Sequence, residues 1–133
     1  MVIDRLPAME PAQSAVVRVY GDQRRLPGDY RVLVDRLWPR GLTREAVDYD
    51  EWTKDLAPSS ELRKWYGHDR DRFEEFARRY RAELDEGSCK ATMKRLLEKA
   101  GPFRLVLLTA TLDVEHSGAA VLQSTMQSLS DRA

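Results

Sequence analysis

The sequence is poor in the residues from which disulfides and metal centres are built. It contains one cysteine, Cys89, and two histidines, His68 and His116, among 133 residues. One thiol permits neither an intramolecular disulfide nor a cysteine-based zinc site, and the two histidines lack the H-E-x-x-H spacing of a catalytic metal centre. A Gly-rich phosphate loop, a G-x-G-x-x-G motif and a G-x-S-x-G motif are also absent. We therefore expect no metal and no bound cofactor.

Long hydrophobic runs and a net charge are missing too. No stretch approaches the roughly 20 apolar residues of a transmembrane helix. Residues 1–14 contain acidic residues and prolines where a signal peptide needs an apolar segment, so we expect a cytoplasmic protein with no membrane partner. The 22 Lys and Arg residues balance the 22 Asp and Glu residues. This balance argues against non-specific coating of nucleic acid, which usually requires a basic excess.

The composition that remains is typical of one globular domain, with 42% hydrophobic and 33% charged residues. Residues 16–20 and 30–34 are short and β-branched, which predicts two strands. The unbroken apolar run at 105–108 predicts a central strand buried on both faces. With helices between the strands, the fold expected over residues 15–130 is a compact α/β layered domain with a small, mostly parallel sheet. Residues 1–14 are expected to form a disordered tail.

Four helices are predicted from their first residues and their apolar spacing. A serine at Pro58-Ser59-Ser60 is expected to cap a helix that ends near Gly67. Apolar residues spaced by three and four follow over 73–84, 93–100 and 114–129. The expected caps of these three helices are Asp71, Ser88, and either Thr111 or Asp113.

The connection between the first two strands leaves their relative direction open. Only about ten residues join them, whereas a parallel crossover usually needs a dozen or more. The two strands are therefore either an antiparallel pair or joined by an unusual connection.

The loop at residues 35–41 carries most of the candidate site residues. In open α/β sheets, ligands bind outside the carboxyl ends of the strands, and this loop directly follows the second predicted strand. Arg36 and Arg40 are suited to phosphate or carboxylate, and Trp38 is suited to stacking on a ring. Asp35 is a candidate for handling protons. The alternative is structural, with an Asp–Arg brace and a tryptophan packed over the core.

Further candidates lie elsewhere in the chain. His116, at the start of the last predicted helix, is the expected acid–base partner of Asp35. Arg63 and Ser59, in the helix that begins after Pro58, are expected to join the ligand contacts. The alternatives are a capping role for His116 and a solvent-exposed turn for His68.

Charge is unevenly distributed along the chain. Residues 24–44 hold six arginines against two aspartates, and residues 45–55 hold five acidic residues against one lysine. A basic block of +4 thus precedes an acidic segment of −4. The two either neutralise each other or serve as surfaces for partners.

Three blocks of residues match one family pattern. The first runs from Tyr30 to Gly41 and ends in D-R-L-W-P-R-G. The second is Trp52 followed by A-P-S-S-E-L-R-K-W at 57–65. The third joins 105–109 to Glu115-His116. With these blocks the chain resembles the YeaO-like bacterial proteins of the domain of unknown function 488.

The resemblance implies a small α/β domain and no settled reaction. It departs from the family pattern at Thr109, where tyrosine is usual, and at Ser117, where asparagine is usual, whereas His116 matches. It favours a functional role for the loop at 35–41, because loops carry function more often than packing does.

Three functions follow from these observations, in order of preference. The first is binding of an anionic nucleotide-type ligand, with or without a reaction on it, through the Asp35–Gly41 loop and His116. The second is a nucleic-acid-binding accessory role, which the basic block motivates. The third is a protein-interaction module that uses the acidic segment.

Overall fold

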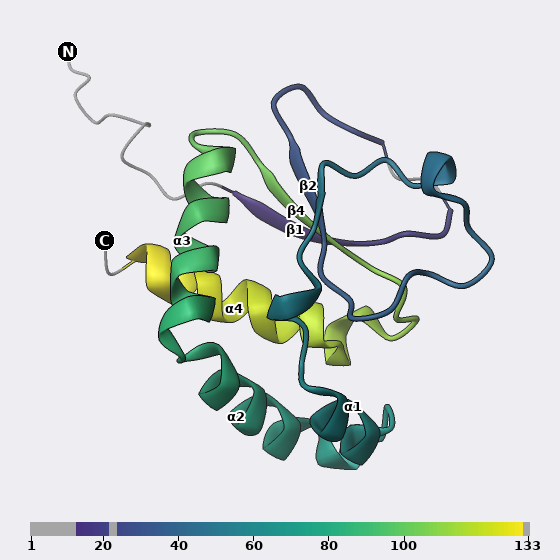
Figure 1. The fold of residues 1–133 in the computed structure, drawn as a ribbon, viewed down its shortest axis with the longest axis vertical. Coiled ribbons are helices and arrows are strands. Elements are labelled where there is room, and N and C mark those ends of the chain that lie inside the picture. Colours follow the sequence, from purple (N-terminus) through teal and green to yellow (C-terminus); the bar gives the residue numbers. More distant parts are fainter. Residues whose placement is uncertain (1–12, 22–23, 132–133) are drawn as a thin grey trace.

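The sheet has four strands, and all of them run in the same direction. The computed structural model describes residues 13–21 and 24–131. The strands are β1 (Ser14–Arg18), β2 (Tyr30–Leu33), β3 (Glu51–Trp52) and β4 (Leu105–Thr109). Their order is β1-β4-β2-β3, and every pair is parallel. The expected α/β architecture is confirmed (Figure 1).

The centre of the sheet is β4, although it is the last strand in the sequence. It pairs with β1 from Ser14–Leu105 to Arg18–Thr109 and with β2 from Tyr30–Leu105 to Leu33–Leu108. All five residues of β4 are buried, because a strand with neighbours on both sides and cover on both faces has no contact with water. The apolar run at 105–108 therefore predicted its position correctly.

The short connection after β1 is explained by this order. The strands β1 and β2 are not paired, because β4 lies between them. The described residues between these two strands, 19–21 and 24–29, contain no helix. The unusual connection, rather than an antiparallel pair, is thus the one observed.

Helices cover one face of the sheet. They are α1 (Ser60–Tyr66), α2 (Phe73–Leu84), α3 (Gly87–Ala100) and α4 (Gly118–Asp131). Alternate strand residues face this layer, among them Val32, Leu105 and Leu107. The helices contribute buried Phe76, Tyr80, Leu84, Met93, Leu96, Leu122 and Met126 to the same core.

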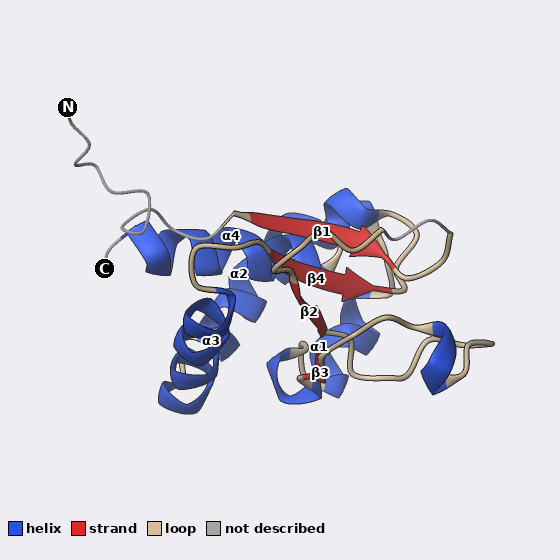
Figure 2. Ribbon diagram, turned by 90° about the horizontal axis from the view of Figure 1, so that it is seen from above, coloured by secondary structure: helices blue, strands red, loops and turns tan. Residues whose placement is uncertain are grey.

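The opposite face is covered by loops and short 3₁₀ turns instead of helices (Figure 2). The intervening strand residues Leu33, Val106 and Leu108 point to this side. Val47 and half-buried aromatic residues of the 38–52 segment pack on them. We call residues 38–53 the loop cover.

Both expected ends of α1 are confirmed, whereas the caps expected for the other three helices are wrong. The Ser59 hydroxyl accepts from the Leu62 N–H at 3.2 Å, and Gly67 ends α1 in the left-handed conformation. Neither Asp71 nor Ser88 caps a helix, since α2 begins directly after a 3₁₀ turn and α3 begins at Gly87.

The cap of α4 is Ser117 rather than Thr111 or Asp113. Its hydroxyl accepts from the Ala120 N–H at 3.1 Å. A 3₁₀ turn, Val114–His116, separates Asp113 from α4, so the expected cap lies too early in the chain.

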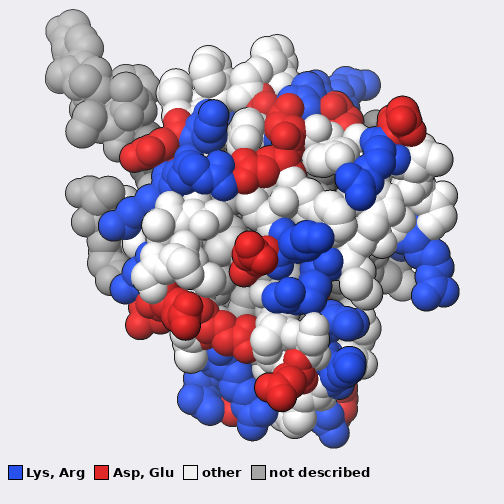
Figure 3. Space-filling model, in the orientation of Figure 1, with Lys and Arg blue, Asp and Glu red and all other residues white. Residues whose placement is uncertain are grey.

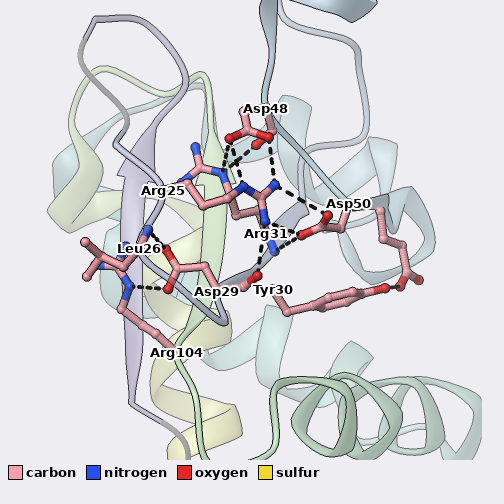
Figure 4. Close-up of polar contacts among 9 residues, drawn as sticks. Arg25, Leu26, Asp29, Tyr30, Arg31, Asp48, Asp50 and Arg104 are labelled. Carbon is pink, nitrogen blue, oxygen red and sulfur yellow. Dashed lines mark hydrogen bonds and ion pairs between the residues drawn. The ribbon is translucent and has the colours of Figure 1, made fainter.

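A network of ion pairs joins the basic block to the acidic segment. It lies near the amino-terminal ends of β2 and β4 (Figure 4). Arg25 binds Asp48 at 2.7 Å and Asp50 at 3.1 Å. Arg31 is only 1% exposed and lies 3.8 Å from the Asp48 carboxylate.

Two further pairs extend this network. Arg104 binds Asp29 at 2.6 Å, and Arg95 binds Glu51. Three of the five acidic residues of the segment at 45–55 are thus ion-paired, as are Arg25 and Arg31 of the basic block. On the face in Figure 3, basic and acidic side chains likewise lie interspersed in small groups.

The N-terminal tail expected over residues 1–14 falls largely outside the described residues. Of its last two, Gln13 is exposed and Ser14 already belongs to β1. Among the described residues, no helix has the length and apolar character needed to span a bilayer.

Candidate functional site

A pocket of about 620 Å³ opens at the carboxyl ends of β2 and β4. The loops that follow these two strands form its two sides, as expected for parallel neighbours. Helix α1 and its N-terminal Pro58 form a third side. Apolar residues dominate the interior, namely Val34, Ala57, Pro58, Tyr66, Phe76 and Ala119.

Asp35 lies where the two strands end and contributes a half-buried carboxylate to the pocket. Its Oδ1 accepts from the Thr109 hydroxyl at 2.7 Å, and its Oδ2 accepts from the Ala110 N–H at 2.7 Å. Burial raises the pKa of this carboxyl above its usual range, although these hydrogen bonds and the charge of His68 act in the other direction. Asp35 therefore both ties β2 to β4 and presents an acceptor to the pocket.

Arg36 is largely engaged in holding the protein together. Its Nε donates to the Pro58 carbonyl at 3.1 Å, and one terminal nitrogen lies 3.4 Å from the Ala57 carbonyl. This arginine lines the pocket but anchors the chain that leads into α1.

Trp38 belongs to an aromatic cluster in the loop cover. Its ring meets those of Tyr49 and Trp52 edge to face at 5.4 Å, and its N–H donates to the Leu42 carbonyl. The Arg44 guanidinium lies over it at 4.6 Å. Because Trp38 also lines the pocket, a ligand contact is compatible with this packing.

Two arginines at the pocket, unlike Arg36, are not engaged in contacts that hold the fold together. Arg40 and Arg63 line the pocket and are both exposed. Neither side chain makes a hydrogen bond or ion pair within the described part of the chain. Arg40 is fixed only through its backbone carbonyl, which accepts from the Tyr20 hydroxyl at 2.8 Å. These guanidinium groups are the cations most available to a bound anion.

Ser59 and His116 do not belong to the pocket lining. Besides capping α1, the Ser59 hydroxyl donates to Glu83 at 2.6 Å. The His116 ring lies 3.0 Å from the Asp113 carboxylate and packs nearly perpendicular to the Phe73 ring, with ring centroids 5.0 Å apart. The structure therefore brings Asp35, Arg36, Trp38, Arg40 and Arg63 together, and leaves Ser59 and His116 beside them.

His68 was not among the expected site residues, yet it lines the pocket. It has a φ of 59°, and it is the one non-glycine residue with a positive φ in the described ranges. It follows Gly67, which also has a positive φ of 56°. Such strained conformations cluster at functional sites. In the sequence, only the adjacent Gly67 indicated a left-handed turn here.

The two departures from the family pattern acquire structural roles. Thr109 is fully buried and holds the Asp35 carboxylate, and Ser117 caps α4. Asparagine is also a favoured cap residue, so the change at 117 preserves the local requirement.

Two solvent-exposed leucines lie at the opening of the pocket. Leu37 is 60% exposed and Leu112 is 77% exposed, and each belongs to one of the two loops that form the sides. Large apolar side chains in water at an opening are suited to contact with a bound ligand. Within residues 13–21 and 24–131, no group of three His, Cys, Asp or Glu residues is arranged to hold a metal ion.

Comparison with known proteins places the chain among uncharacterised relatives. A family model described as the inactive DUF488-N3 subclade matches residues 14–133. The uncharacterized protein Rv3073c of Mycobacterium tuberculosis is 45% identical over 107 residues, which cover 80% of this chain and 87% of that protein. The uncharacterized protein YeaO of Escherichia coli is 38% identical over 112 residues, or 84% and 95% of the two chains. No solved structure matches significantly.

Proposed function

The chain belongs to the DUF488-N3i family, the inactive DUF488-N3 subclade, and on that premise we propose that it binds an anionic ligand of nucleotide type. The ligand occupies the pocket beside the Asp35–Gly41 loop. One observation carries this proposal, namely the two exposed arginines, Arg40 and Arg63, at a pocket of about 620 Å³ that has mostly apolar walls. That volume lies within the range of small-ligand sites.

The chemistry of the pocket favours a ligand with an anionic end and a flat, apolar body. Guanidinium groups bind phosphate or carboxylate through paired N–H donors. Apolar walls such as Val34 and Phe76 favour a ring system over a sugar or a free phosphate ion. A nucleotide combines both features.

Binding is favoured over catalysis. The subclade is described as inactive, and the imidazole expected to work with Asp35 is held outside the pocket by Asp113 and Phe73. In this proposal His116 orients Asp113, which does line the pocket. Asp35 contributes as an acceptor rather than as a base.

A thermal-shift panel tests the proposal on the wild type and Arg40→Ala. The probes are adenosine, guanosine and cytidine 5′-monophosphates, ribose 5-phosphate, inorganic phosphate and a short single-stranded DNA. A ligand at a hundred times its Kd adds about 2.7 kcal/mol, which raises Tm by roughly 5–12 °C for a protein of this size. We expect a nucleotide to give this shift in the wild type.

Arg40→Ala should weaken binding by about 10- to 150-fold, because one charge-assisted hydrogen bond contributes about 1.5–3 kcal/mol. Arg81→Ala is the matched control, since Arg81 is exposed on α2 and outside the pocket. It should leave the shift unchanged. A shift in Arg40→Ala as large as that of the wild type, or no shift with any nucleotide, would contradict the proposal.

The DNA probe addresses the nucleic-acid alternative. Affinity for a polyanion falls steeply as salt rises. A shift with DNA alone that disappears in moderate salt would favour the accessory role over the binding of a free nucleotide.

A further inference from the structure

The pocket lining carries groups of opposite charge. The arginines at 40 and 63 are exposed cations, whereas Asp35 is a half-buried carboxylate at the junction of β2 and β4. An anionic ligand would be repelled by Asp35 if its charged end reached the strand ends. The two ends of the ligand must therefore differ, with the anionic end near the arginines.

The Asp35 carboxylate is fixed and retains free acceptor capacity. Each of its oxygens already accepts one hydrogen bond at 2.7 Å, from the Thr109 hydroxyl and the Ala110 N–H. An ionised carboxylate has about four acceptor sites, so each oxygen has one more to offer. A fixed carboxylate amid apolar walls is matched by a ligand group with two adjacent N–H donors.

Building on the proposed nucleotide site, we propose that the nucleotide enters base-first and that Asp35 selects a base with adjacent N–H donors on its edge, as guanine has. The base lies between the apolar side chains, and the phosphate lies at Arg40 and Arg63. The same chemistry is met in a free guanine nucleotide and in a guanine turned out of a single strand.

The arrangement of the walls supports this orientation. Val34, Tyr66 and Phe76 are each at most 5% exposed and border the pocket. They offer contacts to a flat ring but no partner for a phosphate, because apolar surroundings penalise an unpaired charge. His68 also borders the pocket and faces it from the turn after α1.

The test compares bases that differ only at the edge that Asp35 would read. The probes are guanosine, inosine and xanthosine 5′-monophosphates, with ribose 5-phosphate as the ligand that lacks a base. Inosine lacks the amino group, and xanthosine has a carbonyl in its place. We expect the wild type to prefer the guanosine nucleotide over the xanthosine nucleotide by about 5- to 150-fold, the range for one bidentate base contact.

Asp35→Asn should reverse this preference, because the new amide replaces one acceptor with a donor. The wild-type series stands without the variant if Asp35→Asn does not fold. Equal affinity for all the purine nucleotides, with binding still weakened in Arg40→Ala, would overturn base selection but leave the proposed function intact. Absence of binding by every nucleotide would overturn both.

Two oligonucleotides separate the sources of the base. One is a run of dT that contains a single dG, and the other is the same run without it. Tighter binding of the dG-containing strand than of guanosine 5′-monophosphate supports base reading from a strand. Tighter binding of the free nucleotide supports base reading from the mononucleotide, and failure of dG to improve on dT contradicts base reading in the strand.

Discussion

Asp35 both stabilises the fold and lines the candidate site. Its carboxylate connects the end of β2 to the end of β4 through Thr109 and Ala110. Its carbonyl also accepts from the Trp52 indole N–H at 2.7 Å, which ties the loop cover to the same point. The hallmark D-R-L-W-P-R-G therefore begins with a residue that holds three segments together.

The raised pKa of Asp35 predicts a pH dependence of stability. The pKa of an unfolded aspartate is about 3.9, so above that value the folded state retains a proton that the unfolded state has lost. The free energy of unfolding must then fall as pH rises from about 4 through the folded pKa. Urea unfolding of the wild type and Asp35→Asn, over pH 4–7, should show the wild type losing stability relative to the variant. A relative gain would mean that the hydrogen bonds outweigh burial.

Thr109→Val tests the hydroxyl that supports this carboxylate. Valine has nearly the same shape, so the change removes the hydrogen bond without opening a cavity. A hydrogen bond to a charged group contributes about 1.5–3 kcal/mol, and we expect a loss of stability in that range, measured by chemical denaturation at pH 7. Thr92→Val is the control, because the hydrogen bond of its hydroxyl, to the Ser88 carbonyl, stays within α3. A loss as small as that of the control would contradict the role given to Thr109.

At the scale of the elements, α1 depends on contacts made by the residue that precedes it, Ser59. Ser59 caps the helix, and Glu83 of α2 accepts from both the Ser59 N–H at 2.8 Å and the Ser59 hydroxyl at 2.6 Å. A seven-residue helix is too short to be stable by itself. The contact with α2 therefore positions α1, and with it Arg63, beside the pocket.

Ser59→Ala should lower the free energy of unfolding by about 0.5–2 kcal/mol, the usual cost of losing a helix cap. The measurement is thermal or urea unfolding. Ser60→Ala is the matched control, since Ser60 is exposed and its hydroxyl makes no hydrogen bond among the described residues. Equal effects of the two changes would show that the cap contributes nothing.

Helix α2 holds the aromatic part of the core. Phe76 is 2% exposed and stacks on Tyr66 with ring centroids 4.1 Å apart. Phe76→Ala should cost about 3–5 kcal/mol, whereas Phe103→Ala, at a ring that is 54% exposed, should cost less than about 1 kcal/mol. Urea denaturation of both variants checks this. A cost for Phe76 as small as for Phe103 would mean that the apolar face of α2 is misassigned.

The elements also show what could be predicted from the sequence. The run at 105–108, the apolar spacing of α2 and the Ser59 cap are local patterns, and each led to the right element. The two-residue strand β3 has no such pattern, because it exists only through its pairing with Val32 and Leu33. The position of Ser117 as cap likewise depends on a 3₁₀ turn that no local signal indicated.

The candidate site was predicted in part for the same reason. Asp35 and Arg40 follow a recognisable strand, so their place at its carboxyl end could be inferred. The entry of His68 into the pocket depends on two successive left-handed residues and on the packing of α1. The engagement of Arg36 with carbonyls before α1 is a tertiary contact that residue type cannot reveal.

Taken as a whole, the molecule is built asymmetrically about its sheet. Four helices cover one face, whereas the loop cover protects the other through the aromatic cluster and the ion pairs of Arg25. The hydrogen-bonded helical layer buries most of the core. The loop cover has few regular hydrogen bonds and is therefore expected to open at lower free energy.

Native-state hydrogen exchange tests this difference. Amides of the loop cover, such as those of Asp50 and Thr53, should exchange faster than those in the middle of α2. Arg25→Gln should accelerate exchange in the loop cover selectively, because it breaks the pairs with Asp48 and Asp50. Arg78→Gln is the control, since its pair with Glu75 lies within α2, on the solvent-exposed side of that helix. Uniform exchange across both layers would contradict this asymmetry.

The position of β4 between β1 and β2 also determines when the protein can fold during its synthesis. The ribosome makes β1 and β2 early, but the strand that pairs with both of them follows some 70 residues after β2. Until that strand leaves the exit tunnel, β1 has no neighbour and β2 has only the two residues of β3. The nascent chain therefore exposes an unpaired β1 and an open edge of β2 while the intervening helices are made, and the sheet closes only once β4 is available.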